Sequence, residues 1–554
     1  ENGLIVTAGG GVTIRGLAVT GFPDEGIDLA ATGDGGNFVQ GNIVGLLPDG
    51  TTIAANGGDG IGVFTANNLI GGTVPAHRNV SSGNANAGIT IANDTATGNL
   101  VQGNLIGTDA SGTMARPNST AGNLVGGLLI LNASGNTIGG PAPGDRNVIS
   151  GNREFGVQIF AAEGLTASNN SIGGNYIGVD VTGENLLENE QVGALIASAS
   201  NNRIGGPSDA ERNIIDDGNE SAVSITFSFN NTNPSDGNII EKNYTGVGPS
   251  GSQVSDVQQG VGIFLSGSSN TQIEFNTIAN QGIGIDVNAF FGLNSRAEIF
   301  DNFIGTDSTG ALPIGNSSHG VRISGPHDDN SIEDNVIVAS NNGIRVENGA
   351  TDLFIGGNRL GLPASGPGNA TFGNVSGVVL IGSGYDLRRN EIANNSNDGI
   401  RVQGEDSDRN RFTQNSIFAN GSLGIELGDS NGVTENDVGD NDTGPNQELN
   451  FPVIISAAGG IDTLVIEGTI DSVPVDVEFY ANDQCDPSGN GEGQNYIGED
   501  RLTSGNFTTM LPVAIAEGQF ITAIAIDDEG NTSEFSDCIL ATSAEVIFRD
   551  RFEL

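Results

Sequence analysis

The stretch RNVISGNREFGVQIF, residues 146–160, alternates apolar and polar residues as a β-strand does, breaks at Ser150-Gly151-Asn152, and then resumes. Related phrases occur at residues 78–92 (RNVSSGNANAGITIA) and, in diverged form, at 212–225 (RNIIDDGNESAVSI). A phrase that recurs at intervals marks a structural unit that repeats. The stretch therefore predicts short strands separated by corners, repeated along the chain.

Two other phrases recur between the copies of the first. One is NLVQGNLIGTDASGT (99–113), and the other is VGGLLILNASGNTIGG (125–140). Together the three phrases form a superrepeat of roughly 55 to 70 residues in three turns of about 20 to 24, a period typical of a solenoid. Short strands bounded by Gly and Asn, with no amphipathic helix between them, predict an all-β parallel β-helix of about 20 coils.

Side chains alternate between the two faces of a strand, so each predicted coil has an inner and an outer face. In GVQI, Val157 and Ile159 are expected to point inward and Gln158 outward. The asparagines of NTI, RNVI and NRI are also expected to point inward; they are Asn136, Asn147 and Asn202. Each would stack on its equivalent in the next coil and form amide ladders that satisfy backbone groups at the corners.

The amino-acid composition and the net charge exclude some classes of binding partner. The chain has 554 residues, of which 87 are glycine and 36% are hydrophobic, so it is too apolar for a disordered chain. Its formal charge is -47, which would repel a phosphate backbone or an anionic membrane surface. No apolar run reaches the ~20 residues of a membrane-spanning helix. We therefore expect no nucleic-acid partner and no membrane insertion.

The composition changes after TGPNQELNFPVI (443–454), where glycine thins and longer strand patterns such as VDVEFYA begin. The chain's only two cysteines, Cys485 and Cys538, both lie in this region. A cysteine pair confined to one small domain of a secreted-looking protein indicates a disulfide, with two free thiols as the alternative. A disulfide would place the chain in an oxidising compartment.

The phrases GNLIGTDASGT, NTIGG and RNVISGN, with the closing NSIFANGSLGIELGDSNGVTENDVGDNDTGPNQELNFPVI, resemble the bacterial secreted right-handed β-helix repeat proteins of the pectate-lyase-like solenoid group. The resemblance implies fold and export far more than any reaction, because the group is defined by its repeats. Residues 451–543 resemble the Ig-like β-sandwich modules that follow such solenoids. We therefore expect a solenoid over 1–450, a sandwich over 451–543 and a tail over 544–554.

The sequence contains no convincing catalytic set. Pectate-lyase-like solenoids are often polysaccharide lyases or hydrolases, which need a Lys or Arg base beside carboxylates or calcium, or a carboxylate pair. Lys242 is the only lysine, and sister repeats place Gln40 and Gln102 in its slot, which favours a solvated repeat position. Three scattered histidines offer no zinc site or catalytic triad. We predict no catalytic residues.

Calcium is the one cofactor for which the sequence offers candidate ligands. Asp109, Asp180 and Asp307 share one slot in the pattern G-x-D-x-x-G, but Leu47 and Pro363 hold that slot in other copies. The aspartates are either turn caps that accept backbone N–H bonds or weak calcium ligands. No other metal is expected.

The row of outward residues in G-[VI]-x-[IVL] is the most informative surface feature. It includes Leu129 and Leu195, expected to be exposed, and further along the chain Arg322, Arg345 and Arg401. The arginines either neutralise neighbouring acids or form a basic stripe suited to an acidic glycan or to another copy of the chain.

The tail EVIFRDRFEL (545–554) is too apolar and aromatic for an idle terminus; Val546, Phe548 and Phe552 are its apolar residues in question. It resembles the short terminal tails of some secreted bacterial proteins, which implies an export or sorting role. Two other functions of the tail are alternatives. The tail could fold back on its own sandwich, or cover an uncapped β-helix end of a second copy and build a head-to-tail filament.

The sequence thus predicts an extracellular or cell-surface bacterial protein with a non-enzymatic structural or adhesive function, possible self-association and no cofactor except possible calcium. A polysaccharide-active lyase or hydrolase of the same fold is the first alternative. A passive acidic-glycan-binding module is the second. Depolymerisation assays on acidic polysaccharides would separate the first alternative from the other two.

Overall fold

The computed structural model describes residues 1–543 except 121, 217–219, 229–230, 232, 252–259, 290–295, 327, 348 and 461. The chain divides into two compact units. The first is Glu1–Thr309 with Ile314–Ser317, and the second is Gly310–Pro313 with Ser318–Leu554. The predicted domain limit at residue 450 falls inside the second unit, three residues before strand β44 begins at Val453. That limit stays a prediction.

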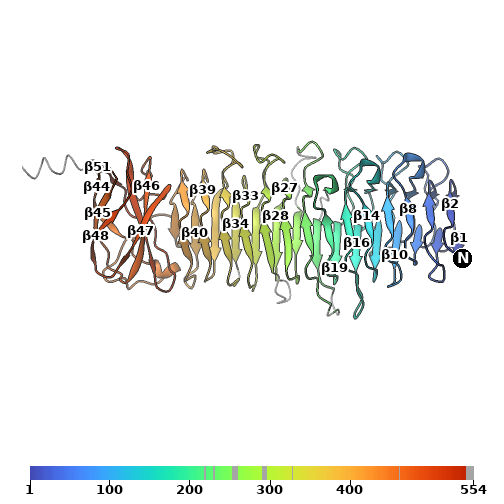
Figure 1. The fold of residues 1–554 in the computed structure, drawn as a ribbon, viewed down its shortest axis with the longest axis horizontal. Coiled ribbons are helices and arrows are strands. Elements are labelled where there is room, and N and C mark those ends of the chain that lie inside the picture. The colour runs from blue at the N-terminus through green and yellow to red at the C-terminus, as the bar shows by residue number, and fades with distance from the viewer. Residues whose placement is uncertain are drawn as a thin grey trace, which may run out of the picture. The chain divides into compact units, whose positions relative to one another are not determined.

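Three parallel sheets of fifteen, fourteen and fourteen strands make up the repeat region, and within each unit the strands of successive coils lie side by side (Figure 1). The first sheet is β1 (Leu4–Val6), β4 (Ile27–Leu29), β7 (Ile61–Val63), β10 (Ile89–Ala92), β13 (Leu128–Leu131), β16 (Phe155–Phe160), β19 (Val192–Ala197), β22 (Ser221–Thr226), β25 (Val261–Leu265) and β28 (Ile283–Asn288) in the first unit, then β31 (His319–Ser324), β34 (Asn342–Glu347), β37 (Ser376–Ile381), β40 (Ile400–Gln403) and β43 (Ile425–Leu427) in the second.

The other two sheets complete each coil. The second sheet is β2 (Thr13–Arg15), β5 (Phe38–Gln40), β8 (Leu69–Gly71), β11 (Leu100–Gln102), β14 (Thr137–Gly139), β17 (Ser171–Gly173), β20 (Arg203–Gly205), β23 (Ile239–Glu241), β26 (Thr271–Glu274), β29 (Ala297–Phe300), β32 (Ser331–Glu333), β35 (Phe354–Gly356), β38 (Asp386–Arg388) and β41 (Arg411–Thr413). The third is β3 (Ala18–Val19), β6 (Ile43–Val44), β9 (Val80–Ser81), β12 (Leu105–Ile106), β15 (Val148–Ile149), β18 (Tyr176–Ile177), β21 (Ile214–Ile215), β24 (Tyr244–Thr245), β27 (Thr277–Ile278), β30 (Phe303–Ile304), β33 (Val336–Ile337), β36 (Arg359–Leu360), β39 (Glu391–Ala393) and β42 (Ser416–Phe418).

Short helices are confined to loops. Among the described residues they are the 3-10 turns η1 (Pro75–His77), η2 (Pro143–Asp145), η3 (Asp209–Glu211) and η5 (Pro445–Glu448). A connection between parallel strands of one sheet is almost always right-handed. The predicted fold class, a right-handed parallel β-helix followed by a small β-sandwich, is confirmed.

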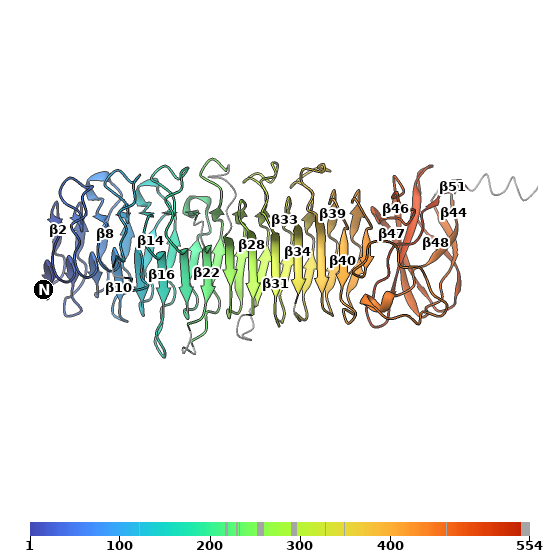
Figure 2. The same ribbon diagram turned by 180° about the vertical axis from the view of Figure 1, so that it is seen from behind.

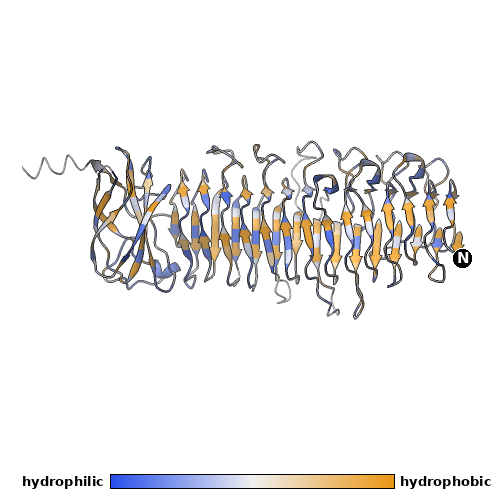
Figure 3. Cartoon of the chain, viewed as in Figure 1, coloured by the Kyte–Doolittle hydropathy of each residue, from blue (hydrophilic) through white to orange (hydrophobic). Residues whose placement is uncertain are grey.

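The core of each coil is made of the inward side chains that the sequence pattern assigned. Val157 and Ile159 are fully buried, and the hydrophobic residues gather on the strands of the sheets (Figure 3). The break at Ser150-Gly151-Asn152 is a corner, where Gly151 has a φ of +70° that a side chain would strain. The chain therefore stops one strand at this corner and begins the strand of the next sheet after it.

The predicted asparagine ladders are present at the corners. Asn147 Oδ1 accepts hydrogen bonds from the Asn104 N–H and side-chain amide, both at 3.0 Å, and the Asn147 amide donates to Asn175 Oδ1 at 2.9 Å. A second ladder runs through Asn136 and Asn202. The asparagine side chains of both ladders are almost completely buried. They accept hydrogen bonds from corner N–H groups, which would otherwise lack a partner.

The coils are fewer and longer than the predicted 20 of about 22 residues. Successive rungs of the asparagine ladders are separated by as few as 21 residues, between Asn374 and Asn395, and by as many as 43, between Asn104 and Asn147. Each coil uses three short strands and corner loops of variable length. The superrepeat, which the sequence analysis divided into three turns, therefore spans two coils of three strands each, since one coil lies between β10, β16 and β22 of its successive copies.

The C-terminal module is a sandwich of two four-stranded sheets (Figure 2, red). One sheet is β48 (Asn506–Leu511), β45 (Leu464–Thr469), β44 (Val453–Gly459) and β51 (Thr542–Ser543). The other is β47 (Asn495–Leu502), β46 (Val475–Asn482), β49 (Phe520–Asp527) and β50 (Ile539–Leu540). Buried side chains such as Leu464, Val477 and Phe479 fill the space between the sheets.

Within the second unit, the sandwich continues an asparagine ladder past its last asparagine. Asn420 Oδ1 accepts bonds from the Asn395 N–H and side-chain amide at 3.2 and 2.8 Å. Glu492 of the sandwich then accepts the same two bonds from Asn420, at 3.0 and 2.8 Å, on its Oε1 atom. Glu492 therefore takes the position that an asparagine of a further coil would occupy.

Two other buried glutamates of the sandwich close the end of the last coil in the same way. Glu534 accepts hydrogen bonds from the N–H groups of Leu427 and Thr434 at 2.9 and 3.0 Å. Glu478 accepts one from the Gln414 N–H at 2.9 Å. An open β-helix end exposes unpaired strand edges, and these carboxyl groups pair several of the exposed donors.

Candidate functional site

The predicted outward row on the first sheet is confirmed in register. In the first unit, Gln158 pairs with Leu129 on one side and Leu195 on the other. Three residues that the sequence analysis left out continue the row after Leu195; they are Ser224, Phe264 and Asp286. The pattern G-[VI]-x-[IVL] at residues 262–265 would have placed Phe264 in the row.

Leu129 and Leu195 are not exposed as expected. Their exposed fractions are 8% and 9%, because neighbouring side chains on the outer face cover them. Phe155, Val192, Leu195 and Ala197 form a small apolar cluster there, against which Phe160 packs. The outer face of the first sheet therefore carries a hydrophobic layer of its own. The alternation of side chains along each strand does not predict this layer.

A groove lies over this layer, on strands β16 to β28, which are side by side in Figure 2. We call it the phenylalanine groove; its lining includes Phe155, Gln191, Leu195, Glu220, Phe264 and Asp286. The mixture of flat apolar rings with a few polar groups is typical of a ligand site.

Two carboxyl groups stand in the phenylalanine groove. Asp286 lies in the outward row and is only 2% exposed, whereas Glu220, just before β22, is exposed. Carboxylates accept hydrogen bonds from hydroxyl groups. Most glycoside hydrolases use a pair of carboxyl groups as their catalytic residues. The groove can therefore hold a hydroxyl-rich ligand.

The arginines of the predicted basic stripe lie in the second unit, and Arg345 and Arg401 have acidic partners. Arg322 and Arg345 are register neighbours on β31 and β34, and Arg345 donates to Glu347 at 2.9 Å. Arg401 is 7% exposed and donates to Asp398 at 2.7 Å. The charges of Arg345 and Arg401 are offset in the way that the neutralising alternative expected. Ligand binding by this stripe stays a prediction.

The aspartates considered for calcium are occupied by their own turns. Asp109 accepts bonds from Ser111 Oγ and from the Thr113 and Met114 N–H groups. Burial raises the pKa of Asp109, but these hydrogen bonds outweigh it and the pKa is lowered. Asp180 shows the same balance with Thr182 and Asn185, and Asp307 accepts a bond from Thr309 Oγ1 at 2.7 Å. Turn capping accounts for all three, and calcium binding stays a prediction.

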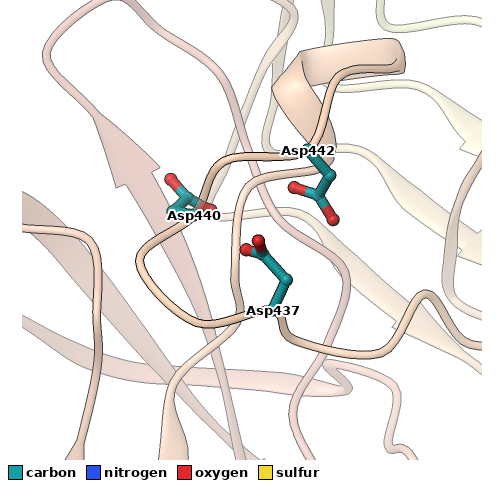
Figure 4. Close-up of side chains that lie close together, drawn as sticks. All are labelled: Asp437, Asp440 and Asp442. Carbon is teal, nitrogen blue, oxygen red and sulfur yellow. The ribbon is translucent and has the colours of Figure 1, made fainter.

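A group of carboxylates that the sequence analysis missed lies in the loop before η5. Ligand atoms of Asp437, Asp440 and Asp442 all lie within 4.8 Å of one another, and their side chains converge in Figure 4. Burial, together with Asp437 and Asp440, raises the pKa of Asp442. Oxygen ligands of this kind suit calcium. The spacing D-x-x-D-x-D at 437–442 was visible in the sequence.

The remaining sequence predictions are met in part. Cys485 and Cys538 form the predicted disulfide, with an S–S distance of 2.07 Å. Contrary to the prediction, Lys242 does not share the slot of Gln40 and Gln102; Glu241 ends β23 there, and Lys242 takes the left-handed corner position of Gly41 and Gly103, with a φ of +55°. Its Nζ lies 4.8 Å from the centre of the Phe275 ring and outside the phenylalanine groove. The tail residues Val546, Phe548 and Phe552 lie outside the described residues, so head-to-tail assembly stays a prediction. No helix in the described part of the chain has the length and apolarity to cross a bilayer.

Comparison with known proteins gives one family match and several similar folds. Residues 250–448 match the family described as periplasmic copper-binding protein (NosD). The structure of the periplasmic alginate epimerase AlgG is 15% identical with a TM-score of 0.33, and the alignment covers 56% of this chain and 65% of that one, just under two thirds. The Dettilon tailspike protein is 12% identical with a TM-score of 0.33, covering 95% of this chain and 88% of that one. No curated protein sequence matches.

The residues of the matched segment do not fit a copper site. Copper takes imidazole, thiolate and thioether ligands. Residues 250–448 contain no cysteine, no methionine and two histidines, His319 and His327. His327 lies outside the described residues, and His319 Nδ1 lies 3.1 Å from the Asn342 amide nitrogen. Burial and the nearby Arg345 and Arg322 lower the pKa of His319 to about 4.

Proposed function

We propose that this protein is exported and binds a polysaccharide in the phenylalanine groove. The observation that carries the proposal is the groove itself, in which Phe155 and Phe264 lie beside Glu220 and Asp286. A sugar ring presents a C–H face and a rim of hydroxyl groups. The rings suit the C–H face, and the carboxylates suit the hydroxyls.

Two features support export. The Cys485–Cys538 disulfide requires an oxidising compartment. The family matched by residues 250–448 is described as periplasmic. A location outside the cell, on the surface or in the medium, belongs to the proposal, since a polysaccharide partner is most accessible there.

Binding without turnover would make the protein an adhesive or structural module. A polysaccharide-active enzyme is the second candidate, favoured by the presence of both Glu220 and Asp286 in one groove. Such an enzyme uses one carboxyl as an acid and the other as a base or nucleophile. The two functions share the groove and differ only in whether bonds in the ligand are broken.

Replacing Phe264 with alanine is expected to weaken polysaccharide binding at least tenfold, because it removes a ring from the groove. Affinity electrophoresis in gels containing dextran, alginate or hyaluronan measures this. Phe38→Ala is the control, since Phe38 is an exposed ring on the second sheet. Equal retention of Phe264→Ala, Phe38→Ala and the unchanged protein would contradict the groove assignment.

Turnover is tested on the same polysaccharides by measuring reducing ends and unsaturated ends. Binding with no new ends supports the adhesive function. Ends that accumulate with the unchanged protein but not with Glu220→Gln support the enzyme. Glu220 is exposed, so its replacement is expected to leave the thermal unfolding temperature unchanged.

A further inference from the structure

A second hollow lies in the second unit, on the outer face of the second sheet. Its floor is Gly356, whose register neighbours Glu333 and Arg388 carry long side chains on the adjacent strands. The missing side chain leaves room for the Phe354 ring between an acidic and a basic residue. We call the pocket around it the arginine hollow; its lining includes Glu333, Asp334, Phe354, Arg388, Arg389 and Arg411.

An aromatic ring forms one wall of the arginine hollow. A Cβ atom built on Gly356 would lie 2.5 Å from Phe354 Cζ, so the Phe354 ring leans over the glycine. Gly356 has an ordinary strand conformation, because its φ is not among the positive values. A glycine is therefore required here because a side chain would collide with the Phe354 ring. The backbone conformation itself does not require one.

Three arginines, Arg388, Arg389 and Arg411, also line the arginine hollow. Arg388 donates to Asp386 Oδ1 at 2.6 Å, and Arg389 Nε donates to Gln414 Oε1 at 3.3 Å. Arg411 is exposed, and among the described residues its guanidinium has no assigned partner. This convergence is unusual for a chain with 20 basic and 67 acidic residues. Arg411 and the free N–H groups of Arg389 can bind an anion.

Acidic side chains limit which anion fits. Glu333, Asp334 and Glu499 line the hollow, and Asp386 lies at its edge beside Arg388. With four carboxylates near three guanidiniums, a dianion such as phosphate would be repelled more strongly than a monoanion. A ligand with one carboxylate and several hydroxyl donors can place its charge against the guanidiniums and donate hydrogen bonds to the carboxylates.

We propose that the arginine hollow binds a uronic-acid residue of an acidic polysaccharide. The sugar carboxylate accepts hydrogen bonds from Arg411 and Arg389, and its hydroxyls donate to Glu333 and Asp334. The C–H face of the ring packs on Phe354. Arg–carboxylate pairs are strong and directional, which makes the charge of the sugar the main determinant of specificity.

This site is separate from the phenylalanine groove and does not require it. The groove belongs to the first unit and the first sheet, whereas the hollow belongs to the second unit and the second sheet. Phe264→Ala removes a ring from the groove and leaves the hollow intact. Its effect therefore distinguishes failure of one proposal from failure of the other.

The test is isothermal titration of the full chain with oligogalacturonate, oligomannuronate and hyaluronan oligomers, each with its carboxyl-esterified or carboxyl-reduced form, and with inorganic phosphate. Arg411→Ala is expected to weaken binding of at least one uronate oligomer by tenfold or more. Arg15→Ala is the matched control, because Arg15 is an exposed arginine on β2 of the same sheet in the other unit. Phe354→Ala removes the ring on which the sugar packs without changing charge and is expected to give a similar loss.

Three results with the oligomers would overturn the proposal, and a fourth with phosphate. They are no binding of any uronate oligomer, an equal loss in Arg15→Ala and Arg411→Ala, or equally tight binding of the neutralised oligomers. Phosphate that competes with the uronates at equal concentration would also overturn it. Retained affinity in Phe264→Ala with loss in Arg411→Ala and Phe354→Ala supports it. Unchanged thermal unfolding of each variant shows that lost binding is not lost folding.

Discussion

Asn147→Leu is expected to lower the free energy of unfolding by about 3 kcal/mol. Leucine has nearly the shape of asparagine but can neither accept the two bonds from Asn104 nor donate to Val101 O and Asn175. These groups are buried, and each one left unpaired costs about 1 to 3 kcal/mol. Denaturant unfolding followed by circular dichroism measures the loss.

Gln158→Leu is the matched control on the neighbouring strand. Gln158 lies between Leu129 and Leu195 in the outward row, and its buried Oε1 has no hydrogen-bond partner. Leucine there would extend the apolar layer and leave no polar group unpaired, so stability is expected to stay the same or rise. Equal losses in the two variants would contradict the inward and outward assignment.

Raising the pH from 5 to 9 is expected to destabilise the closed end of the last coil. Burial raises the pKa of Glu492 to about 7 and that of Glu534 to about 8, and burial also raises the pKa of Glu426 to about 7. The ordinary value is about 4.5. Between these values the folded state keeps protons that the unfolded state has released, so stability falls as pH rises.

The loss is on the order of 3 kcal/mol for each fully shifted carboxyl. Carboxyls whose pKa is lowered, such as Asp109 and Asp180, change their contribution only below about pH 4, outside this window. Hydrogen exchange of peptides spanning 411–427 locates the effect at the last coil. Protection that is constant from pH 5 to pH 9, after correction for intrinsic exchange, would contradict the pKa values.

Glu492→Gln isolates one of these carboxyls. Glutamine keeps the Oε1 acceptor that Asn420 uses and cannot ionise, as an asparagine of the ladder cannot. We expect higher stability than the unchanged protein at pH 9 and little difference at pH 5. Glu517→Gln, at an exposed position in the sandwich, is the control and is expected to change stability at neither pH.

The β-helix architecture could be predicted from the sequence because it depends on short patterns that repeat along the chain. Alternation in GVQI assigned Val157 and Ile159 to the core, and the recurring asparagine before each short strand predicted the ladders. Cys485 and Cys538 could be paired because the chain has no other cysteines. The number of coils was overestimated, because the superrepeat was divided into three turns although it spans two coils.

The candidate sites depend on contacts between residues one or more coils apart. Phe155, Leu195 and Phe264 form one groove only because β16, β19, β22 and β25 pair in a particular register. Arg388 and Glu333 face each other across Gly356 for the same reason. The arginines singled out by sequence, Arg345 and Arg401, are instead paired with acids.

By itself, the sequence determined the parallel β-helix, its inner and outer faces, its asparagine ladders and the disulfide-linked sandwich that follows. These features need only neighbours along the chain and a repeated pattern. Only the tertiary structure decided which outward side chains meet, and that buried glutamates close the last coil. Both outcomes depend on loop lengths and strand register, which set distances between residues that are remote in sequence.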